Sequence, residues 1–202
     1  LQAHWSYMDG YAAGMIALSG CLSGRVSRAL SESRDNDAEA ELDRLAQIFG
    51  PDSTYVELQN VGLDVQQAAF LGLPKLAERR KLPLVATGDV HYLDATDAHS
   101  HDALLCIQSG DSLKNPNRWR FGADEFYFKT PAEMALDFPG HEDAMRRSLE
   151  VADRCSVELE LGRIRLPRFP VPEGRDAFDY LVELCEKGLV KRYGASTPEL
   201  DE

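Results

Sequence analysis

The stretch Leu82-Pro83-Leu84-Val85-Ala86-Thr87-Gly88-Asp89-Val90-His91-Tyr92 contains a short apolar run that passes directly into polar residues. The run is too short for a helix and follows a long helical pattern, which is typical of a buried parallel strand. Side chains alternate along extended backbone, so Asp89 and His91 point the same way. The sequence therefore predicts a strand over 84–86 that ends in two residues able to bind one metal ion. The alternative is that Asp89 only orients His91 by a hydrogen bond, or that both are exposed loop residues.

Two further strands are expected upstream, over Met15–Leu18 and Thr54–Gln59, and helical patterns lie between the strands. The first expected helix follows Ser23, which could cap it. The second runs from about Asp37 to Ile48. The third runs from about Val65 to Arg80, and Pro74 is expected to kink it or split it in two. Strands that alternate with helices in this way predict a parallel α/β architecture, either an open sheet or a barrel.

After His91 the sequence changes character. We expect helices over 97–109, 141–155 and 177–193, a short aromatic strand over 126–128, and a helix capped by Thr130 with Pro131 in its first turn. Residues 158–173 are rich in proline and predict an extended segment, so we place a domain boundary there.

The composition is that of an ordinary globular protein, with 202 residues, 44% hydrophobic residues and a net charge of −12. The acidic balance argues against a general nucleic-acid-binding surface on this chain, and no apolar run is long enough to span a membrane. The chain begins with Leu1 and ends in a charged run, so we expect a piece of a longer protein. Its 4 cysteines have no CxxC spacing, and a reducing cytoplasmic compartment fits them best.

Cys21 follows the predicted strand over 15–18, as Asp89 and His91 follow the strand over 84–86. A thiolate, a carboxylate and an imidazole at the ends of parallel strands would suit zinc, whereas manganese or iron would suit the carboxylate and imidazole better than the thiolate. The alternative for Cys21 is a small buried residue beside glycines. We expect the other cysteines, Cys106, Cys155 and Cys185, to be buried thiols.

The segment Arg118-Trp119-Arg120-Phe121 has the basic and aromatic content of a phosphate or single-strand contact, although such loops more often pack their aromatic residues inward. His99 and His101 lie two residues apart on a predicted helix and so face different directions. His101 is a candidate neighbour of the Asp89–His91 pair, with a solvated or capping role as the alternative.

Several stretches together resemble the bacterial DNA polymerase III alpha subunit, a C-family replicative polymerase, in its polymerase-and-histidinol-phosphatase (PHP) domain. The resemblance runs from about Met15 to Gly194, and the stretches that carry it are Ile16–Gly24, Leu82–Tyr92, His101–Gly110, Asn115–Arg118, Glu125–Lys129 and Leu166–Pro172.

The resemblance implies a distorted (βα)7-type PHP barrel, with its C-terminal part over residues 1–165. Residues 166–202 then form a proline-rich crossing and the first helix of the polymerase palm. By motif, Cys21 matches the family's cysteine ligand, and Asp89 and His91 match its Asp-x-His pair. His101 and Arg118 are expected beside the metal or in contact with phosphate.

The activity that the resemblance implies is that of a DNA-directed DNA polymerase with a metal-dependent 3′–5′ exonuclease in its PHP domain. Zinc or manganese is expected in the PHP site and magnesium in the polymerase site. The expected partners are DNA, dNTPs, a separate proofreading exonuclease and the sliding clamp.

The sequence departs from the family pattern in two respects. Gly88 stands where the family commonly has Asn, and the family's early ligands and polymerase aspartates are absent from this chain, so we expect the chain alone to be inactive. Two alternatives stay open. One is a non-catalytic PHP scaffold that docks a separate exonuclease, and the other is a stand-alone PHP phosphatase.

Overall fold

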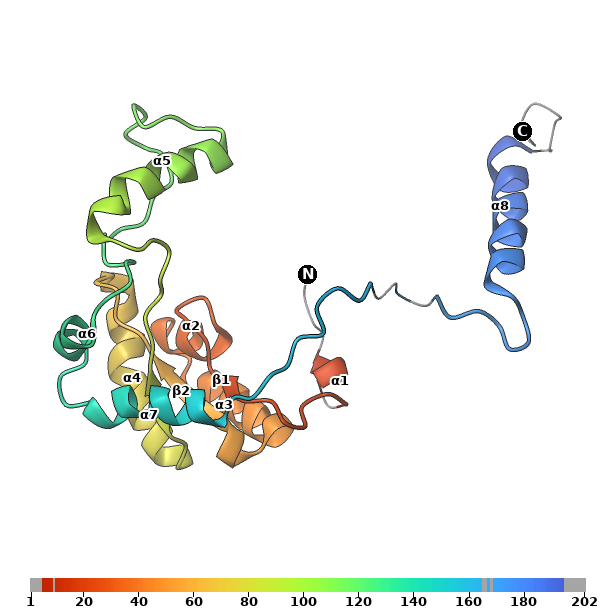
Figure 1. Ribbon diagram of the computed structural model, residues 1–202. Helices are drawn as coiled ribbons and strands as arrows, with labels where there is room; N and C mark the ends of the chain where they lie inside the picture. Colours follow the sequence, from red (N-terminus) through yellow and green to blue (C-terminus); the bar gives the residue numbers. More distant parts are fainter. Residues whose placement is uncertain (1–4, 9, 165–166, 168, 195–202) are drawn as a thin grey trace. The chain divides into compact units, whose positions relative to one another are not determined.

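The computed structural model describes residues 5–8, 10–164, 167 and 169–194. The chain divides into two compact units, residues 1–156 and residues 157–202 (Figure 1). The first unit contains the sheet and most of the helices, and the second contains the extended segment and the last helix.

The first unit is built on a 3-stranded parallel sheet in the order β1-β2-β3. The strands are β1 (Ala17–Leu18), β2 (Thr54–Leu58) and β3 (Leu84–Ala86). The register pairs Ala17 with Thr54 and Val56 with Leu84. β2 therefore lies in the middle, and its near-continuous burial is typical of a strand covered on both faces.

Three helices contribute most of the hydrophobic core next to this sheet: α2 (Arg25–Ser31), α3 (Asp35–Phe49) and α4 (Gln67–Arg80). Phe138 and Ala144 also belong to this core. α2 packs against both α3 and α4. Acidic residues in the first turn of α3 favour its start, because they face the positive end of the helix dipole. The fully buried side chains of this core include Val26, Ala38, Leu42, Val56, Leu58 and Leu76.

The first unit also contains short 3-10 helices and further α-helices. They are α1 (Trp5–Met8), η1 (Pro51–Ser53), η2 (Asp64–Gln66), η3 (Ala95–Asp97), α5 (Ala98–Ser109), α6 (Pro131–Asp137) and α7 (Glu142–Arg154). α7 packs against β3, while α5 projects from the body of the unit (Figure 1). α6 begins with a capping box, in which the hydroxyl of Thr130 accepts from the N–H of Glu133 and the carboxylate of Glu133 accepts from the N–H of Thr130.

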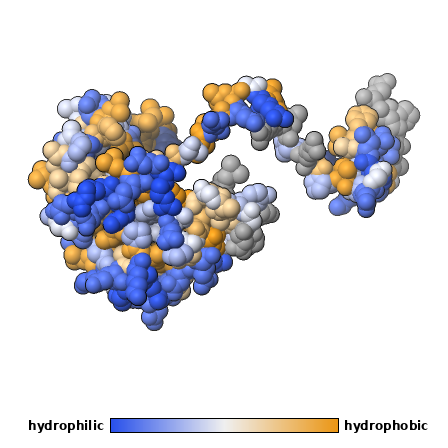
Figure 2. Space-filling model, turned by 60° about the horizontal axis from the view of Figure 1, so that its bottom comes forward, coloured by the Kyte–Doolittle hydropathy of each residue, from blue (hydrophilic) through white to orange (hydrophobic). Residues whose placement is uncertain are grey.

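The second unit contains α8 (Ala177–Tyr193), whose first turn is capped by the Asp176 carboxylate. None of the α8 side chains that the structure describes is buried, and the helix leaves Phe178 and Leu181 exposed. On the face of the first unit that Figure 2 shows, hydrophobic and hydrophilic residues are interspersed.

The predicted fold class is confirmed, because the structure is α/β with parallel strands and is consistent with part of a PHP barrel. The strand over 84–86 and the helix over 177–193 lie where the sequence predicted them. Pro74 lies inside α4 and does not divide it.

Three local predictions were wrong. Residues 126–128 form only an isolated bridge, Tyr92 to Tyr127, and no strand. The N-cap of α2 is Gly24, without a side-chain cap from Ser23. Cys155 and Cys185 are exposed, because the first follows the end of α7 and the second lies on the uncovered α8; only Cys106 is buried as expected.

No helix in the described part of the chain is both long enough and apolar enough to cross a membrane.

The central strand makes a clear prediction about stability. Leu58 on β2 is 0% exposed, so Leu58→Ala should lower the free energy of unfolding by about 2–5 kcal/mol through lost burial and a residual cavity. Leu136→Ala is the matched control, since Leu136 is 81% exposed and its truncation should change stability by less than about 0.5 kcal/mol. Denaturant unfolding followed by circular dichroism measures both, and equal effects would contradict the assignment of β2 to the core.

Candidate functional site

The carboxyl ends of the three strands meet in a network of hydrogen bonds around Glu57. The Glu57 carboxylate accepts from the N–H of Gly20 at 3.0 Å and from the hydroxyl of Thr87 at 2.6 Å. The Gln59 side-chain amide donates to the same carboxylate at 3.3 Å, and the hydroxyl of Ser19 accepts from the Glu57 N–H at 2.9 Å. This edge of a parallel sheet is where α/β proteins commonly place their functional groups.

Cys21 lies in a tight turn at this edge, directly after β1. Gly20 adopts a φ of 87°, a left-handed conformation that favours glycine. A Cβ on Gly24 would lie 2.9 Å from the carbonyl oxygens of both Cys21 and Ser19, so the turn leaves no room for a side chain there. Cys21 is partly buried and lines a narrow cavity together with Glu57 and other residues.

Asp89 and His91 lie beside one another after β3. The Nδ1 atom of His91 is 2.9 Å from the backbone carbonyl oxygen of Asp89 and 3.7 Å from its Oδ1 atom. A carbonyl only accepts, so the hydrogen bond requires Nδ1 to carry a proton, and in the neutral tautomer of this kind the lone pair is on Nε2. That is the arrangement of a histidine prepared to bind a metal through Nε2.

The His91 ring packs among aromatic rings. Its centroid lies 5.0 Å from that of Phe121, 5.3 Å from that of Phe126 and 5.5 Å from that of His101. Burial lowers the pKa of His101, and the neighbouring His91 lowers it further. His101 is therefore a neutral imidazole against His91 at neutral pH.

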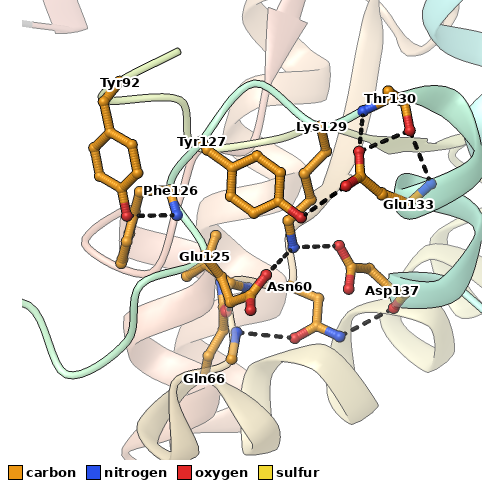
Figure 3. Close-up of polar contacts among 12 residues, drawn as sticks. Asn60, Gln66, Tyr92, Glu125, Phe126, Tyr127, Lys129, Thr130, Glu133 and Asp137 are labelled. Carbon is orange, nitrogen blue, oxygen red and sulfur yellow. Dashed lines mark hydrogen bonds and ion pairs between the residues drawn. The ribbon is translucent and has the colours of Figure 1, made fainter. Parts of the chain in front are cut away.

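In the region of residues 125–137, residues 126–128 hold the segment of His91 and Tyr92 in place. The Phe126 N–H donates to the Tyr92 hydroxyl at 3.4 Å (Figure 3). The His91 N–H donates to the carbonyl of Phe126 at 2.8 Å, and the Phe128 N–H donates to the carbonyl of Tyr92 at 3.1 Å. The Asn60 side chain donates to the carbonyl of Asp137 at 3.0 Å and so joins this region to the loop after β2.

Lys129 lies at the centre of that region with a side chain only 6% exposed. Its ammonium group contacts the carboxylates of Glu125 and Asp137, each at 2.7 Å (Figure 3). Burial acts to lower the pKa of Lys129, but the hydrogen bonds and charges of the two carboxylates outweigh it and raise the pKa. The ammonium therefore stays charged at neutral pH and connects the residues before α6 to the end of that helix.

A polar pocket of about 290 Å³ lies beside the aromatic cluster, between α5 and the loop that follows it. Arg118 and Asp102 form one wall of it. The Arg118 guanidinium donates from Nε to Asp102 Oδ1 at 3.1 Å and from Nη2 to Asp102 Oδ2 at 2.5 Å. Arg118 also donates to the carbonyl of Asn115 at 3.2 Å, so its guanidinium is already engaged. Arg120 also lines the pocket and makes no hydrogen bond or ion pair with any residue that the structure describes.

The predicted ligands do not form one compact group. Within the described ranges, no three His, Cys, Asp or Glu side chains lie close enough together to hold a metal ion. Asp89 and His91 are adjacent, and His101 contacts the His91 ring, whereas Cys21 lies in the cavity next to Glu57.

Sequence reasoning missed Glu57 and Thr87, which make the contacts at the strand ends. The only available signal was a glutamate in the otherwise apolar run Tyr55-Val56-Glu57-Leu58. A charged residue at a position that a central parallel strand buries needs polar partners, but the sequence alone does not name them.

The PHP domain family profile matches residues 2–61, which include β1, β2 and the turn that carries Cys21. This part of the chain is therefore similar to PHP domains. Asp89 and His91 lie outside the matched residues.

The chain is also similar to curated proteins named DNA polymerase III subunit alpha. It is 43% identical to the Thermus aquaticus protein over 91% of the chain and 15% of that protein. It is 35% identical to the protein of Mycobacterium tuberculosis strain H37Rv over 96% of the chain and 17% of that protein. It is 36% identical to the Pseudomonas aeruginosa protein over 93% of the chain and 16% of that protein.

Most of the chain is thus similar to one part of proteins named DNA polymerase III subunit alpha. The chain spans between 15% and 17% of the length of these relatives.

The Arg118–Asp102 pair predicts a pH dependence. The hydrogen bond from Arg118 lowers the pKa of Asp102, so the pair stabilises the fold above the unfolded-state pKa of about 4, and this contribution is lost as the pH falls through the lower folded-state value. Asp102→Asn should therefore lower the melting temperature at pH 7, and the difference from the unaltered chain should close below about pH 4. A difference that stays constant with pH would contradict the ion pair.

Proposed function

We propose that this chain is part of a bacterial DNA polymerase III alpha subunit and acts in DNA replication. The observation that carries the proposal is identity of 35–43% over 91–96% of the chain to proteins of that name. DNA and dNTPs are then the substrates of the complete protein, a DNA-directed DNA polymerase in the cytoplasm. Polymerisation uses magnesium held by residues outside this chain, and the other holoenzyme subunits include a proofreading exonuclease and a sliding clamp.

Within that protein, we infer that Cys21, Asp89 and His91 contribute to a divalent metal centre of zinc or manganese. The donor set supports this, because thiolate and imidazole are good zinc ligands and carboxylate suits both ions. The hydrogen bond at His91 Nδ1 supports it further by leaving Nε2 available. The three side chains do not form one group among the described residues, and we propose that the complete protein supplies further ligands.

The reaction we assign to such a centre is 3′–5′ hydrolysis of a phosphodiester. The bound metal would supply the positive charge that stabilises the developing phosphate charge. His101 supports the His91 ring from α5. Since Arg118 is paired with Asp102, Arg120 is the better candidate for a phosphate contact at the polar pocket.

The second candidate function is a non-catalytic PHP scaffold that docks a separate exonuclease. The observation that favours it is the lack of any three-ligand group among the described residues. A stand-alone PHP phosphatase is disfavoured, because a polymerase match over 96% of the chain must include most of residues 157–202.

The metal assignment is tested in the complete natural protein that contains this sequence. Asp89→Ala and His91→Ala should each remove bound metal and lower 3′–5′ exonuclease activity by at least about 100-fold, while primer extension stays within about twofold. Metal analysis of purified protein and degradation of a labelled primer measure the two effects.

Cys155→Ser is the matched control for Cys21→Ser, since Cys155 is exposed and lies after α7. Only the change at Cys21 should lower the metal content. Unaltered protein that binds metal poorly and lacks exonuclease activity, yet still extends primers, would favour the scaffold.

A further inference from the structure

We propose that Glu57 is a positioning residue that fixes the loop carrying Cys21 relative to the segment carrying Asp89 and His91. The inference rests on the proposed function, which makes those three side chains metal ligands. The role of Glu57 itself is argued from its contacts and does not require a bound metal.

The Glu57 carboxylate forms hydrogen bonds with the segments that follow both strands next to β2. Its Oε2 atom accepts from the N–H of Gly20, the residue directly before Cys21, at 3.0 Å. Its Oε1 atom accepts from the hydroxyl of Thr87, two residues before Asp89, at 2.6 Å. Each candidate ligand segment is therefore attached to β2 close to its ligand.

The surrounding groups match a carboxylate that accepts hydrogen bonds. Gln59 is 8% exposed, and its side-chain amide donates both to Glu57 Oε1 at 3.3 Å and to the Thr87 hydroxyl at 3.1 Å. An ionised carboxylate only accepts, so donors from three residues satisfy it without a cation. Its observed contacts position neighbouring segments and leave metal binding to other side chains.

Removal of the carboxylate would leave the Gly20 N–H and the Thr87 hydroxyl without this acceptor at a partly buried edge. The β1 turn should then open more often, because a hydrogen bond to a charged group closes it in the unaltered protein. Cys21 reports on that opening directly, since its thiol is partly buried in the same turn.

The test measures alkylation of individual cysteines by iodoacetamide in the complete natural protein, with metal removed by a chelator and peptides resolved by mass spectrometry. Glu57→Ala should raise the alkylation rate of Cys21 by about tenfold, as expected for the loss of charge-assisted hydrogen bonds. The exposed Cys155 and Cys185 should react at unchanged rates, and Cys106, which is 4% exposed, should stay slow.

Glu57→Gln is the matched conservative variant. Its Oε1 atom can accept from the Gly20 N–H, and its Nε2 group can donate to the Thr87 hydroxyl, which rotates to accept. The long contact of 3.3 Å from the Gln59 amide is lost, but Gln59 still donates to Thr87 and the Gly20 bond that holds the turn is kept. Cys21 should therefore react at close to the original rate in this variant. Before the chelator is added, Glu57→Gln should contain bound metal as the unaltered protein does, and Glu57→Ala should contain less.

An unchanged Cys21 rate in Glu57→Ala would overturn the proposal, and so would a parallel rise at Cys106, which would indicate general destabilisation. Loss of metal in Glu57→Gln together with an unchanged Cys21 rate would also overturn it, by making Glu57 a ligand. If the unaltered protein binds no metal, the metal function fails, whereas the alkylation rates still decide whether Glu57 holds the turn.

Discussion

The parallel pairing of β2 with both of its neighbours is the constraint on which the rest of the first unit depends. It brings Ser19, Gly20 and Thr87 to the end of β2, where Glu57 accepts hydrogen bonds from both neighbouring segments. The same strand sends Val56 and Leu58 into the core enclosed by α2, α3 and α4. β2 therefore contributes both to the stability of the first unit and to the arrangement of the candidate ligand segments.

The sequence predicted the elements whose signals are local. The apolar run over 84–86 and the Thr130-Pro131 helix start were correct, because strand burial and capping leave distinct patterns in a few residues. The exposure of Cys155 and Cys185 was not predictable in this way, since burial depends on what packs against a helix face. The missing strand at 126–128 shows the same limit, because aromatic content favours extended backbone but does not provide a partner strand.

In the candidate site, too, some features were predictable from local sequence and others depend on the fold. The pairing of Asp89 with His91 was predictable from their spacing, whereas the engagement of Arg118 by Asp102 depends on the fold of the loop after α5. The similarity to polymerase alpha subunits covers 91–96% of the chain, so it includes both the PHP-like residues and most of the second unit. The chain spans 15–17% of the length of those relatives.

The most direct test of this account is anomalous diffraction at the zinc and manganese absorption edges, from crystals of the complete natural protein grown with those metals. The account predicts an anomalous peak at the carboxyl ends of the strands, within about 2.0–2.2 Å of the Nε2 atom of His91 and an oxygen of Asp89. A peak elsewhere, or no peak at this edge of the sheet under saturating metal, would contradict it.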